Sequence, residues 1–257
     1  MTPPEQAMAA PRVLAWFSCG DASAVAAKLA VDKYGDRCEV LYCDTFAYEH
    51  PDNRRFFADV EQWLGRSIRV LSSPDYKDIY DVFQRTRYLV GIRGARCTTE
   101  LKKNVRTAYQ RIDDLHVFGF TVDEQHRVDR FHREQPDLRA EFPLIDSGMT
   151  KTQCHVVVRQ AGIELPAMYR LGYSNNNCIG CVKGGSGYWN KIRKDFPEVF
   201  AKMAQTEREL DAAICKTEGT TDGTRWRKRL FLDELPPDVG RYTAEPDIEC
   251  GVLCNVD

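Results

Sequence analysis

The chain lacks several features that would narrow its function at once. It has no excess of positive charge, because 36 lysines and arginines stand against 38 aspartates and glutamates, and the formal net charge is −2. This excludes a general attraction for nucleic acid but leaves a local basic face open. Residues 1–11 show no basic region, and no long apolar run or internal repeat follows. We therefore expect no signal peptide, no membrane anchor and a cytoplasmic protein.

Cysteine, in contrast, is abundant, with ten residues in the chain. Without secretion, this number argues against a disulfide framework and favours metal or redox roles for some of the thiols. Cys38 and Cys43 lie in a strand-like run, and Cys154 and Cys215 lie in helix-like runs. We expect these four to be ordinary core residues.

Strand and helix patterns alternate along the first half of the chain. Apolar runs predict strands at 13–18, 39–45, 68–72 and 116–121, and helical periodicity predicts helices at 22–34, 53–64, 76–85, 98–112 and 123–131. This order predicts an α/β fold, a Rossmann-like parallel sheet with helices on both faces. We expect a nucleotide-binding domain at 12–145.

Composition changes near residue 143, and the remainder predicts a helical, cysteine-bearing C-terminal extension. We expect residues 146–257 to pack on the first domain as one unit. The patterns there predict a helix at 150–162, a strand at 168–173, a helix at 188–215 and irregular structure beyond residue 218.

A segment of small residues, Ser18-Cys19-Gly20-Asp21-Ala22-Ser23, joins the first predicted strand to its helix. Backbone N–H groups and the positive helix N-terminus at such a turn can hold an anion, and Gly20 allows close approach. The Gly-Lys-Ser/Thr of a Walker loop and the glycine pattern of a Rossmann dinucleotide site are both absent. An ordinary strand-to-helix turn is the alternative. Asp21 would repel phosphate unless it pointed away or bound magnesium.

Three cysteines stand in a pattern suited to a soft metal. Cys178 and Cys181 form a Cys-x-x-Cys pair in a segment rich in asparagine and glycine, and Cys97 lies far upstream. Two thiolates on one tight loop, completed by a distant third, suit zinc or an iron–sulfur cluster. A structural zinc and plain thiols remain alternatives, while the glycines at 180, 184 and 185 favour a loop around a bulkier cluster.

In their order along the chain, these motifs resemble the phosphoadenosine-phosphosulfate (PAPS) reductase family, within the PP-loop ATP-pyrophosphatase-like (adenine nucleotide α-hydrolase-like) superfamily. The similarity extends from about residue 13 to the C-terminus. The family's loop is usually Ser-Gly-Gly-x-Asp-Ser, so Cys19 and Ala22 depart from it, which bears on ATP cleavage more than on nucleotide binding. The further matching segments are Asp44-Thr45, Arg96–Lys102, Gly119-Phe120-Thr121 with Glu124 and Arg127, and Glu249-Cys250-Gly251-Val252-Leu253, where Leu253 replaces a histidine.

The resemblance implies an oxidoreductase that binds an adenine nucleotide and reduces an adenylyl sulfate, PAPS or its unphosphorylated form APS, to sulfite. Cys250 would be the nucleophile, and a thioredoxin-like protein the thiol donor. The implied nucleotide-binding residues are Ser18, Cys19, Gly20, Asp21, Ala22, Ser23, Asp44 and Thr45. The implied anion-binding residues are Arg96, Lys102 and Arg127. The implied ligands of a [4Fe–4S] cluster are Cys97, Cys178 and Cys181, with Cys254, Cys250 or an external group as the fourth.

Two other functions stay open from the sequence. One is ATP-dependent sulfur transfer to a nucleic acid or small acceptor, which a three-cysteine cluster and the basic run Arg225-Trp226-Arg227-Lys228-Arg229 would suit. That run also fits a solvated face or a subunit contact. The other is a nucleotide-binding or redox-sensing module without catalysis, which the Cys19 and Ala22 departures favour. The sequence gives no oligomeric state.

Overall fold

The structure is a computed structural model, and it describes residues 10–91 and 94–249 of the chain. The chain divides into two compact units. Unit 1 consists of Met1–Tyr42, Phe56–Val70 and Tyr109–Leu165, and unit 2 consists of Cys43–Arg55, Leu71–Ala108 and Pro166–Asp257. Neither unit is a continuous stretch of sequence, because the chain crosses between them several times.

A five-stranded sheet has the order β3-β2-β1-β6-β7. Its strands are β1 (Val13–Phe17), β2 (Cys38–Cys43), β3 (Arg69–Leu71), β6 (Leu115–Phe118) and β7 (Arg139–Glu141). The central strand β1 pairs in parallel with β2 and with β6, and β6 pairs in parallel with β7. All five residues of β1 are buried, as expected for a parallel strand covered on both faces. The predicted α/β fold with a parallel sheet is confirmed.

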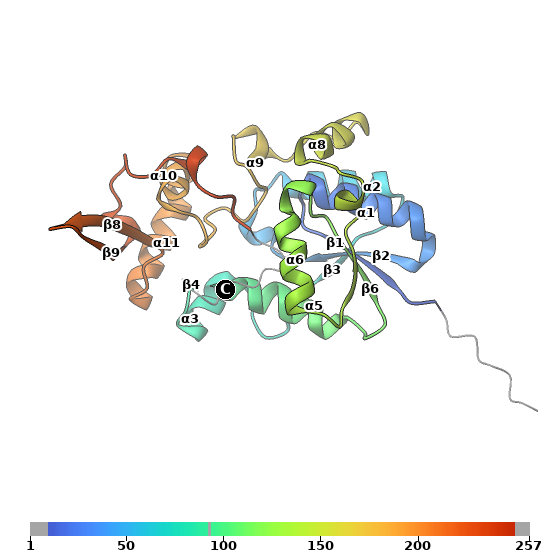
Figure 1. Ribbon diagram of the computed structural model, residues 1–257, viewed down its shortest axis with the longest axis horizontal. Coiled ribbons are helices and arrows are strands. Elements are labelled where there is room, and N and C mark those ends of the chain that lie inside the picture. Colours follow the sequence, from blue (N-terminus) through green and yellow to red (C-terminus); the bar gives the residue numbers. More distant parts are fainter. Residues whose placement is uncertain (1–9, 92–93, 250–257) are drawn as a thin grey trace, which may run out of the picture. The chain divides into compact units, whose positions relative to one another are not determined.

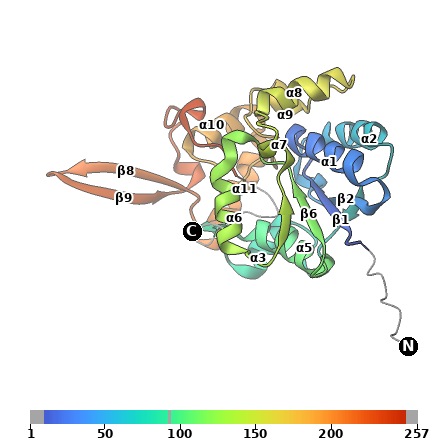
Figure 2. The ribbon, with the colours of Figure 1, turned by 45° about the vertical axis from the view of Figure 1, so that its right-hand side comes forward.

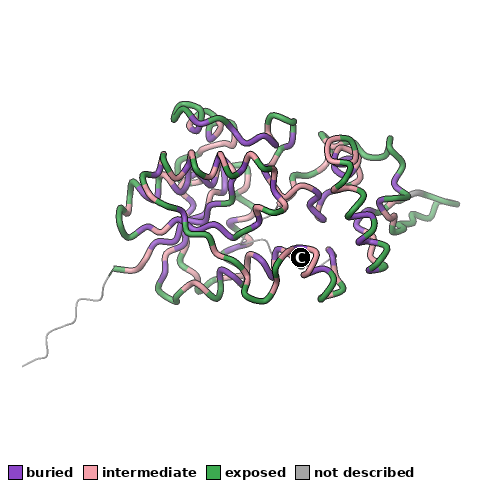
Figure 3. Tube along the Cα trace, turned by 180° about the vertical axis from the view of Figure 1, so that it is seen from behind, coloured by how far each residue is buried: buried purple, intermediate pink, exposed green. Residues whose placement is uncertain are grey.

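Helices flank this sheet (Figure 1). They are α1 (Asp21–Tyr34), α2 (Asn53–Leu64), α6 (Gln125–Glu134), α7 (Pro143–Asp146) and α8 (Lys151–Gln160). Helix α1 packs on β1 and β6 with its alanine-rich face, and α7 and α8 pack against it. Figure 3 shows the buried residues concentrated along the central strands.

Unit 2 has a second hydrophobic core, centred on Phe83, Trp189, Ile192, Met203 and Leu232, which are all 0% exposed. Its helices are α3 (Ile79–Thr86), α4 (Arg96–Thr98), the π-helix η3 (Thr99–Lys103), α5 (Asn104–Tyr109), α9 (Ala167–Arg170), α10 (Ser186–Asp195) and α11 (Pro197–Leu210). Its strands form two antiparallel pairs, β4 (Val90–Gly91) with β5 (Gly94–Ala95) and β8 (Cys215–Thr221) with β9 (Thr224–Leu230). Short 3₁₀ turns over both units are η1 (Gly35–Arg37), η2 (Phe46–Tyr48), η4 (Val122–Glu124), η5 (Leu232–Glu234) and η6 (Tyr242–Ala244).

Three predicted elements in the C-terminal part were wrong. Residues 168–173 begin inside the short helix α9 rather than in a strand, with Pro166 at the position before its first turn. The predicted helix 188–215 is two helices separated at Phe196, with Pro197 as the first residue of the second, and Cys215 begins a strand. Beyond residue 218 the chain continues a β-hairpin whose two-residue turn, Asp222-Gly223, has φ values of 49° and 75°. Aspartate and glycine tolerate this left-handed backbone, and they form the type of turn that closes hairpins.

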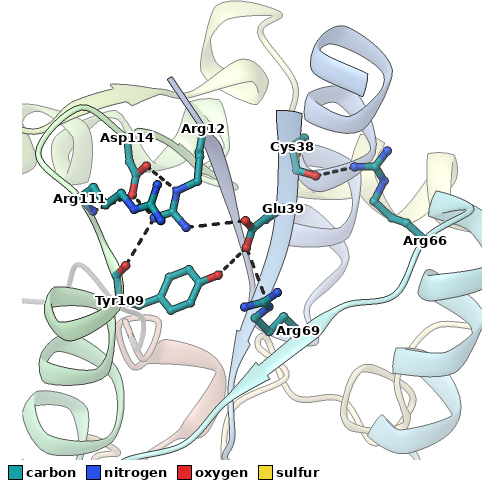
Figure 4. A network of polar contacts seen from close by, with 8 residues as sticks. All are labelled: Arg12, Cys38, Glu39, Arg66, Arg69, Tyr109, Arg111 and Asp114. Carbon is teal, nitrogen blue, oxygen red and sulfur yellow. Dashed lines mark hydrogen bonds and ion pairs between the residues drawn. The ribbon is translucent and has the colours of Figure 1, made fainter. Parts of the chain in front are cut away.

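A polar network lies around the start of β1 in unit 1 (Figure 4). Arg12 donates two hydrogen bonds to the Asp114 carboxylate, at 2.9 and 2.7 Å. Burial raises the pKa of Asp114, but the hydrogen bonds from Arg12 and the Arg111 N–H, together with the charge of Arg12, lower it by more, so the pKa lies below its ordinary value. Arg12 and Arg69 also lie within 4 Å of Glu39 on β2. The network pairs opposite charges at the edge of the sheet where the strands begin. Ligands of such sheets bind at the opposite edge, where the strands end, so we assign the network a structural role.

The four cysteines expected in the core are buried, which confirms that prediction. Cys38, Cys43, Cys154 and Cys215 are between 0% and 5% exposed. Burial raises the pKa of Cys43 to about 11 and that of Cys154 and Cys215 to about 12. These thiols therefore remain protonated near neutral pH and are poor nucleophiles.

Glu207 of α11 is 0% exposed and holds both ends of the β8–β9 hairpin. Its carboxylate accepts hydrogen bonds from the backbone N–H groups of Ile214 and Leu232, at 2.5 and 2.6 Å. Burial raises the pKa of Glu207 to about 7. The hairpin base is thus attached to the core through a group that titrates near neutral pH.

We expect the free energy of unfolding to fall as pH rises from about 4.5 to about 7. The unfolded chain releases this proton near the ordinary value of 4.5, whereas the folded protein holds it to about 7, so the folded state binds more protons in this window. The loss should reach about 3 kcal/mol, at ~1.4 kcal/mol per pH unit. Urea unfolding at pH 5, 6, 7 and 8 would measure it. In Glu207→Gln, which resembles the protonated carboxyl, this pH dependence should disappear; an unchanged slope would contradict the assignment.

No helix in the described part of the chain is long and apolar enough to cross a membrane.

Candidate nucleotide and thiol sites

The predicted phosphate loop lies between β1 and α1 in unit 1. Ser23 closes it: its hydroxyl accepts a hydrogen bond from the Ser18 N–H at 3.1 Å and donates one to the Gly20 carbonyl at 2.8 Å. Cys19 has φ of 56°, a left-handed conformation that glycine adopts more easily. Cys19 stands where the Ser-Gly-Gly pattern has its first glycine, and it adopts a backbone conformation typical of glycine. Its side chain is buried.

The loop also lies where the strand order of the sheet reverses. From β1 the chain proceeds to β2 and β3 on one side, and then returns to place β6 and β7 on the other. Ligands of open α/β sheets bind outside the strand ends at such a point. Gly119, directly after β6, approaches the loop so closely that a Cβ there would lie 2.6 Å from the Ser23 Cα. The end of β6 and the start of α1 thus form one tightly packed edge.

Asp21, inside this loop, lies against helix α8. Its side chain is 1% exposed, and one carboxylate oxygen lies 3.0 Å from the Nε2 atom of His155 on α8. Asp21 therefore contacts a residue of a different helix. His155 was not singled out from the sequence, because nothing in its local pattern places α8 against α1.

Asp44 and Thr45 follow β2 and belong to unit 2. Asp44 is exposed, and its carboxylate accepts a hydrogen bond from the Phe46 N–H at 3.2 Å. Thr45 is buried and donates to Glu49 at 2.6 Å. Asn53 donates to the other Glu49 oxygen at 2.6 Å, and Asn176 donates to Asn53 at 2.9 Å. This buried chain, which the sequence did not reveal, connects the predicted adenosine segment to the residues just before Cys178.

The three cysteines predicted as metal ligands line a single pocket of unit 2. Cys97, Cys178 and Cys181 face an open space of about 380 Å³. The other lining residues are mainly apolar, with Thr45, Thr98 and Lys102 as the polar ones, and Cys178 also borders a second pocket of about 360 Å³. Within the described residues, no three histidine, cysteine or acidic side chains converge closely enough to hold one metal ion.

The Cys178–Cys181 loop is held from the inside by Tyr188 of α10. The Tyr188 hydroxyl accepts a hydrogen bond from the Cys181 N–H at 2.9 Å and donates one to the Cys178 carbonyl at 3.3 Å. Gly180 has φ of 74°, and a Cβ there would lie 2.7 Å from Val199. The Ile179 N–H donates to the Tyr48 carbonyl at 2.7 Å. Both thiols are therefore positioned by a constrained backbone.

Replacing Tyr188 with phenylalanine should loosen this loop. The substitution leaves the Cys181 N–H and the Cys178 carbonyl without their common partner inside the protein, at a cost of about 1–3 kcal/mol in unfolding free energy. Denaturant unfolding measures this. Tyr80→Phe is the matched control, because the Tyr80 hydroxyl makes no hydrogen bond among the described residues and its ring packs on Phe83. Equal losses in the two variants would show that the hydroxyl does not hold the loop.

The predicted anion-binding residues are divided between the units. Lys102 lines the thiol pocket, and Arg96 pairs with Glu100 at 2.7 Å in the same segment. Cys97 and Lys102 lie on either side of the start of η3, a π-helix, which is a rare element often found at functional sites. Arg127 of unit 1 pairs with Glu124 and lies 4.0 Å above the Phe120 ring. An anion at Arg96 or Arg127 would therefore share the guanidinium with a resident carboxylate.

The last described residues are fastened beside the cysteine loop. Asn177 donates to the Ile248 carbonyl at 3.0 Å, and Lys183 donates to the Glu249 carbonyl at 2.8 Å. Slightly upstream, Glu245 accepts hydrogen bonds from the N–H groups of Gly187 and Tyr188 at the start of α10. The predicted nucleophile Cys250 and the predicted ligand Cys254 lie outside the described residues.

No protein-family model matches the chain, and no curated protein matches it.

Proposed function

We propose that the protein is an enzyme of sulfur metabolism that binds an adenine nucleotide and reduces an adenylyl sulfate to sulfite with electrons from a dithiol protein. The observation that carries the proposal is the pocket lined jointly by Cys97, Cys178 and Cys181, next to Thr45 of the predicted adenosine segment. The closed loop at the strand-order reversal supports nucleotide binding. Both features suit the family that the motifs resemble.

For the thiol pocket we propose a [4Fe–4S] cluster rather than a single zinc. Zinc draws its thiolates to about 2.3 Å from one point, and the described residues offer no such convergence. A cluster takes its thiolates from around a larger body, and three thiols on an apolar lining suit that requirement. Cys97, Cys178 and Cys181 would hold it, and Cys254 or an external group would complete it, because the proposed chemistry uses Cys250 as the nucleophile. When bound, the cluster would supply a redox-active centre near the substrate.

The chemistry proposed for the chain's own residues is a thiol displacement. The Cys250 thiolate attacks the sulfur of the adenylyl sulfate, the bond between sulfur and the phosphate oxygen breaks, and AMP (or its 3′-phosphate) leaves. A thiolate of the dithiol carrier then attacks the Cys250 sulfur, which releases sulfite and forms a mixed disulfide. The second carrier thiol resolves it, so the two electrons come from the carrier. Lys102 would balance negative charge during the displacement.

Sulfite release tests this proposal directly. Protein purified without oxygen would be incubated with APS or PAPS, thioredoxin and thioredoxin reductase. We expect sulfite from one of the two nucleotides, and its loss in Cys250→Ser with the iron content unchanged. Sulfite release that persists in Cys250→Ser would remove this residue as the nucleophile. No turnover with either nucleotide would overturn the reductase proposal and leave nucleotide binding without catalysis, or sulfur transfer, in its place.

ATP-dependent sulfur transfer to a nucleic acid is the second candidate. It is favoured by the exposed basic hairpin β8–β9 and by the single thiol at Cys97. In that reaction ATP would adenylate the acceptor with loss of pyrophosphate, and a sulfide donor would then displace AMP. Incorporation of labelled sulfide into RNA that requires ATP would establish it.

A further inference from the structure

The β8–β9 hairpin concentrates positive charge in an otherwise acidic chain. Residues 215–230 hold five lysines and arginines against two acidic residues, a net charge of +3, whereas the formal charge of the whole chain is −2. Figure 2 shows the hairpin as a two-stranded ribbon that extends from the helical part of unit 2. The charge is therefore local, on one narrow element.

The register of the hairpin places most of this charge on one face. Side chains alternate between faces along a strand, so Arg225, Arg227 and Arg229 of β9 share a face at intervals of about 6.8 Å. Lys216 lies directly opposite Arg229, and Glu218 lies opposite Arg227. One face of the hairpin therefore carries four cations and one carboxylate, and we call it the basic face. Its charged residues are Lys216, Glu218, Arg225, Arg227 and Arg229.

The other face carries Trp226, which is 43% exposed. Its indole N–H donates to the Thr221 hydroxyl at 3.0 Å, a bond that fixes the ring near the turn. Lys228 shares this face. An exposed aromatic ring held beside cations can stack on a base while the cations bind phosphates.

Nothing within the described part of the chain covers this hairpin. Its strands pair only with each other, and no residue from 216 to 229 whose exposure is described is buried. Between its cations and the acidic residues that the structure describes, the one ion pair is a 4.0 Å contact of Arg225 with Glu218, two largely exposed side chains. An isolated two-stranded hairpin has only marginal stability in water. Here the base of the hairpin is attached to the core through Glu207. Its charge therefore contributes little to holding the fold and is open to a partner.

We propose that the hairpin binds a single-stranded nucleic acid, with the basic face on the phosphates and Trp226 against a base. Charge complementarity and the exposed ring select this occupant. A membrane surface is disfavoured, because Trp226 is the one large apolar side chain exposed between 216 and 229 in the described residues. The inference goes beyond the reductase proposal and depends on no part of its chemistry.

Fluorescence anisotropy with a labelled 20-nucleotide single-stranded RNA would test this. We expect binding that weakens with salt, and at least a tenfold loss of affinity in R225Q/R227Q/R229Q. The slope of log affinity against log salt should fall by about 2, at ~0.7 for each phosphate that no longer has its arginine. Trp226→Ala should cost roughly tenfold in affinity. R133Q/R139Q/R159Q removes the same charge from exposed positions of unit 1 and should bind as the parent protein does.

Single-stranded DNA and a duplex of the same length complete the test. Binding of single-stranded DNA as tight as that of RNA supports recognition of backbone and base without the 2′-hydroxyl. Tighter binding to the duplex would overturn the proposal, and so would equal losses in the two triple variants or no binding at micromolar protein. Circular dichroism shows that each variant is folded. Sulfite release measured on the hairpin variant separates the two proposals, because loss of RNA binding with unchanged turnover affects only this one.

Discussion

Replacing Cys178 with serine should lower the iron bound per chain, in protein purified without oxygen, from about four atoms to fewer than one. Cys178 borders the two pockets described above, and its carbonyl is fixed by Tyr188, so a serine oxygen would occupy the same position as a much weaker ligand. Acid-labile sulfide should fall in parallel. Metal analysis and the visible absorption of the cluster measure both quantities.

Cys215→Ala is the control for this substitution. Cys215 also belongs to unit 2, but it is 3% exposed and burial raises the pKa of its thiol to about 12. Its variant should keep the parent iron content. Cys97→Ser tests the third ligand and should lose iron as Cys178→Ser does. One zinc per chain in the parent protein would contradict the cluster, and iron retained in both serine variants would contradict the choice of ligands.

Gly119→Val should weaken nucleotide binding at least tenfold. A Cβ at this position would lie 2.6 Å from the Ser23 Cα and 2.8 Å from the Ala22 carbonyl oxygen. These are backbone atoms, so the clash is relieved only if α1 and the loop before it move away from β6. Such overpacking also lowers the unfolding free energy by about 1–3 kcal/mol. Isothermal titration with ATP, APS and PAPS measures the affinity, and thermal unfolding measures the stability.

The control for Gly119→Val is Gly148→Ala, in the same unit. A Cβ at Gly148 would meet nothing within 4 Å, but the residue has φ of 66°, so alanine there costs stability without touching the loop. We expect a lower melting temperature with unchanged nucleotide affinity. If both variants lost affinity equally, the effect would come from stability alone and not from the loop.

The parallel sheet could be predicted because its strands are continuous apolar runs. Val13–Phe17 is buried along its whole length. A strand buried on both faces is a continuous apolar run, so it can be recognised without an alternation of polar and apolar residues. The β8–β9 hairpin was missed for the opposite reason, since its residues pack against almost nothing and so carry no hydrophobic pattern. The one local signal for it was the Asp222-Gly223 turn.

The sequence predicted the candidate site through its motifs, but it did not reveal the contacts that hold the site residues in place. The sequence grouped Cys97 with Cys178 and Cys181, and the structure places the three on one pocket. Hydrogen bonds such as that from Asn176 to Asn53 join residues 123 positions apart, and no local pattern encodes them. The Tyr188 hydroxyl is likewise visible only once α10 is seen beneath the cysteine loop.

Glu245 gives the chain an internal competitor for anions. Helix α10 follows Gly184 and Gly185, and its local sequence would suit a phosphate as well as the start of α1 does, yet its first N–H groups already donate to the Glu245 carboxylate. A group tethered in the same chain acts at an effective concentration in the millimolar range, far above that of a dilute nucleotide. Concentrated phosphate or sulfate could displace it. Glu245 belongs to the same segment as Ile248 and Glu249, which Asn177 and Lys183 hold beside the cysteine loop, so the choice of buffer anion would alter residues 245–249 before it altered the nucleotide loop.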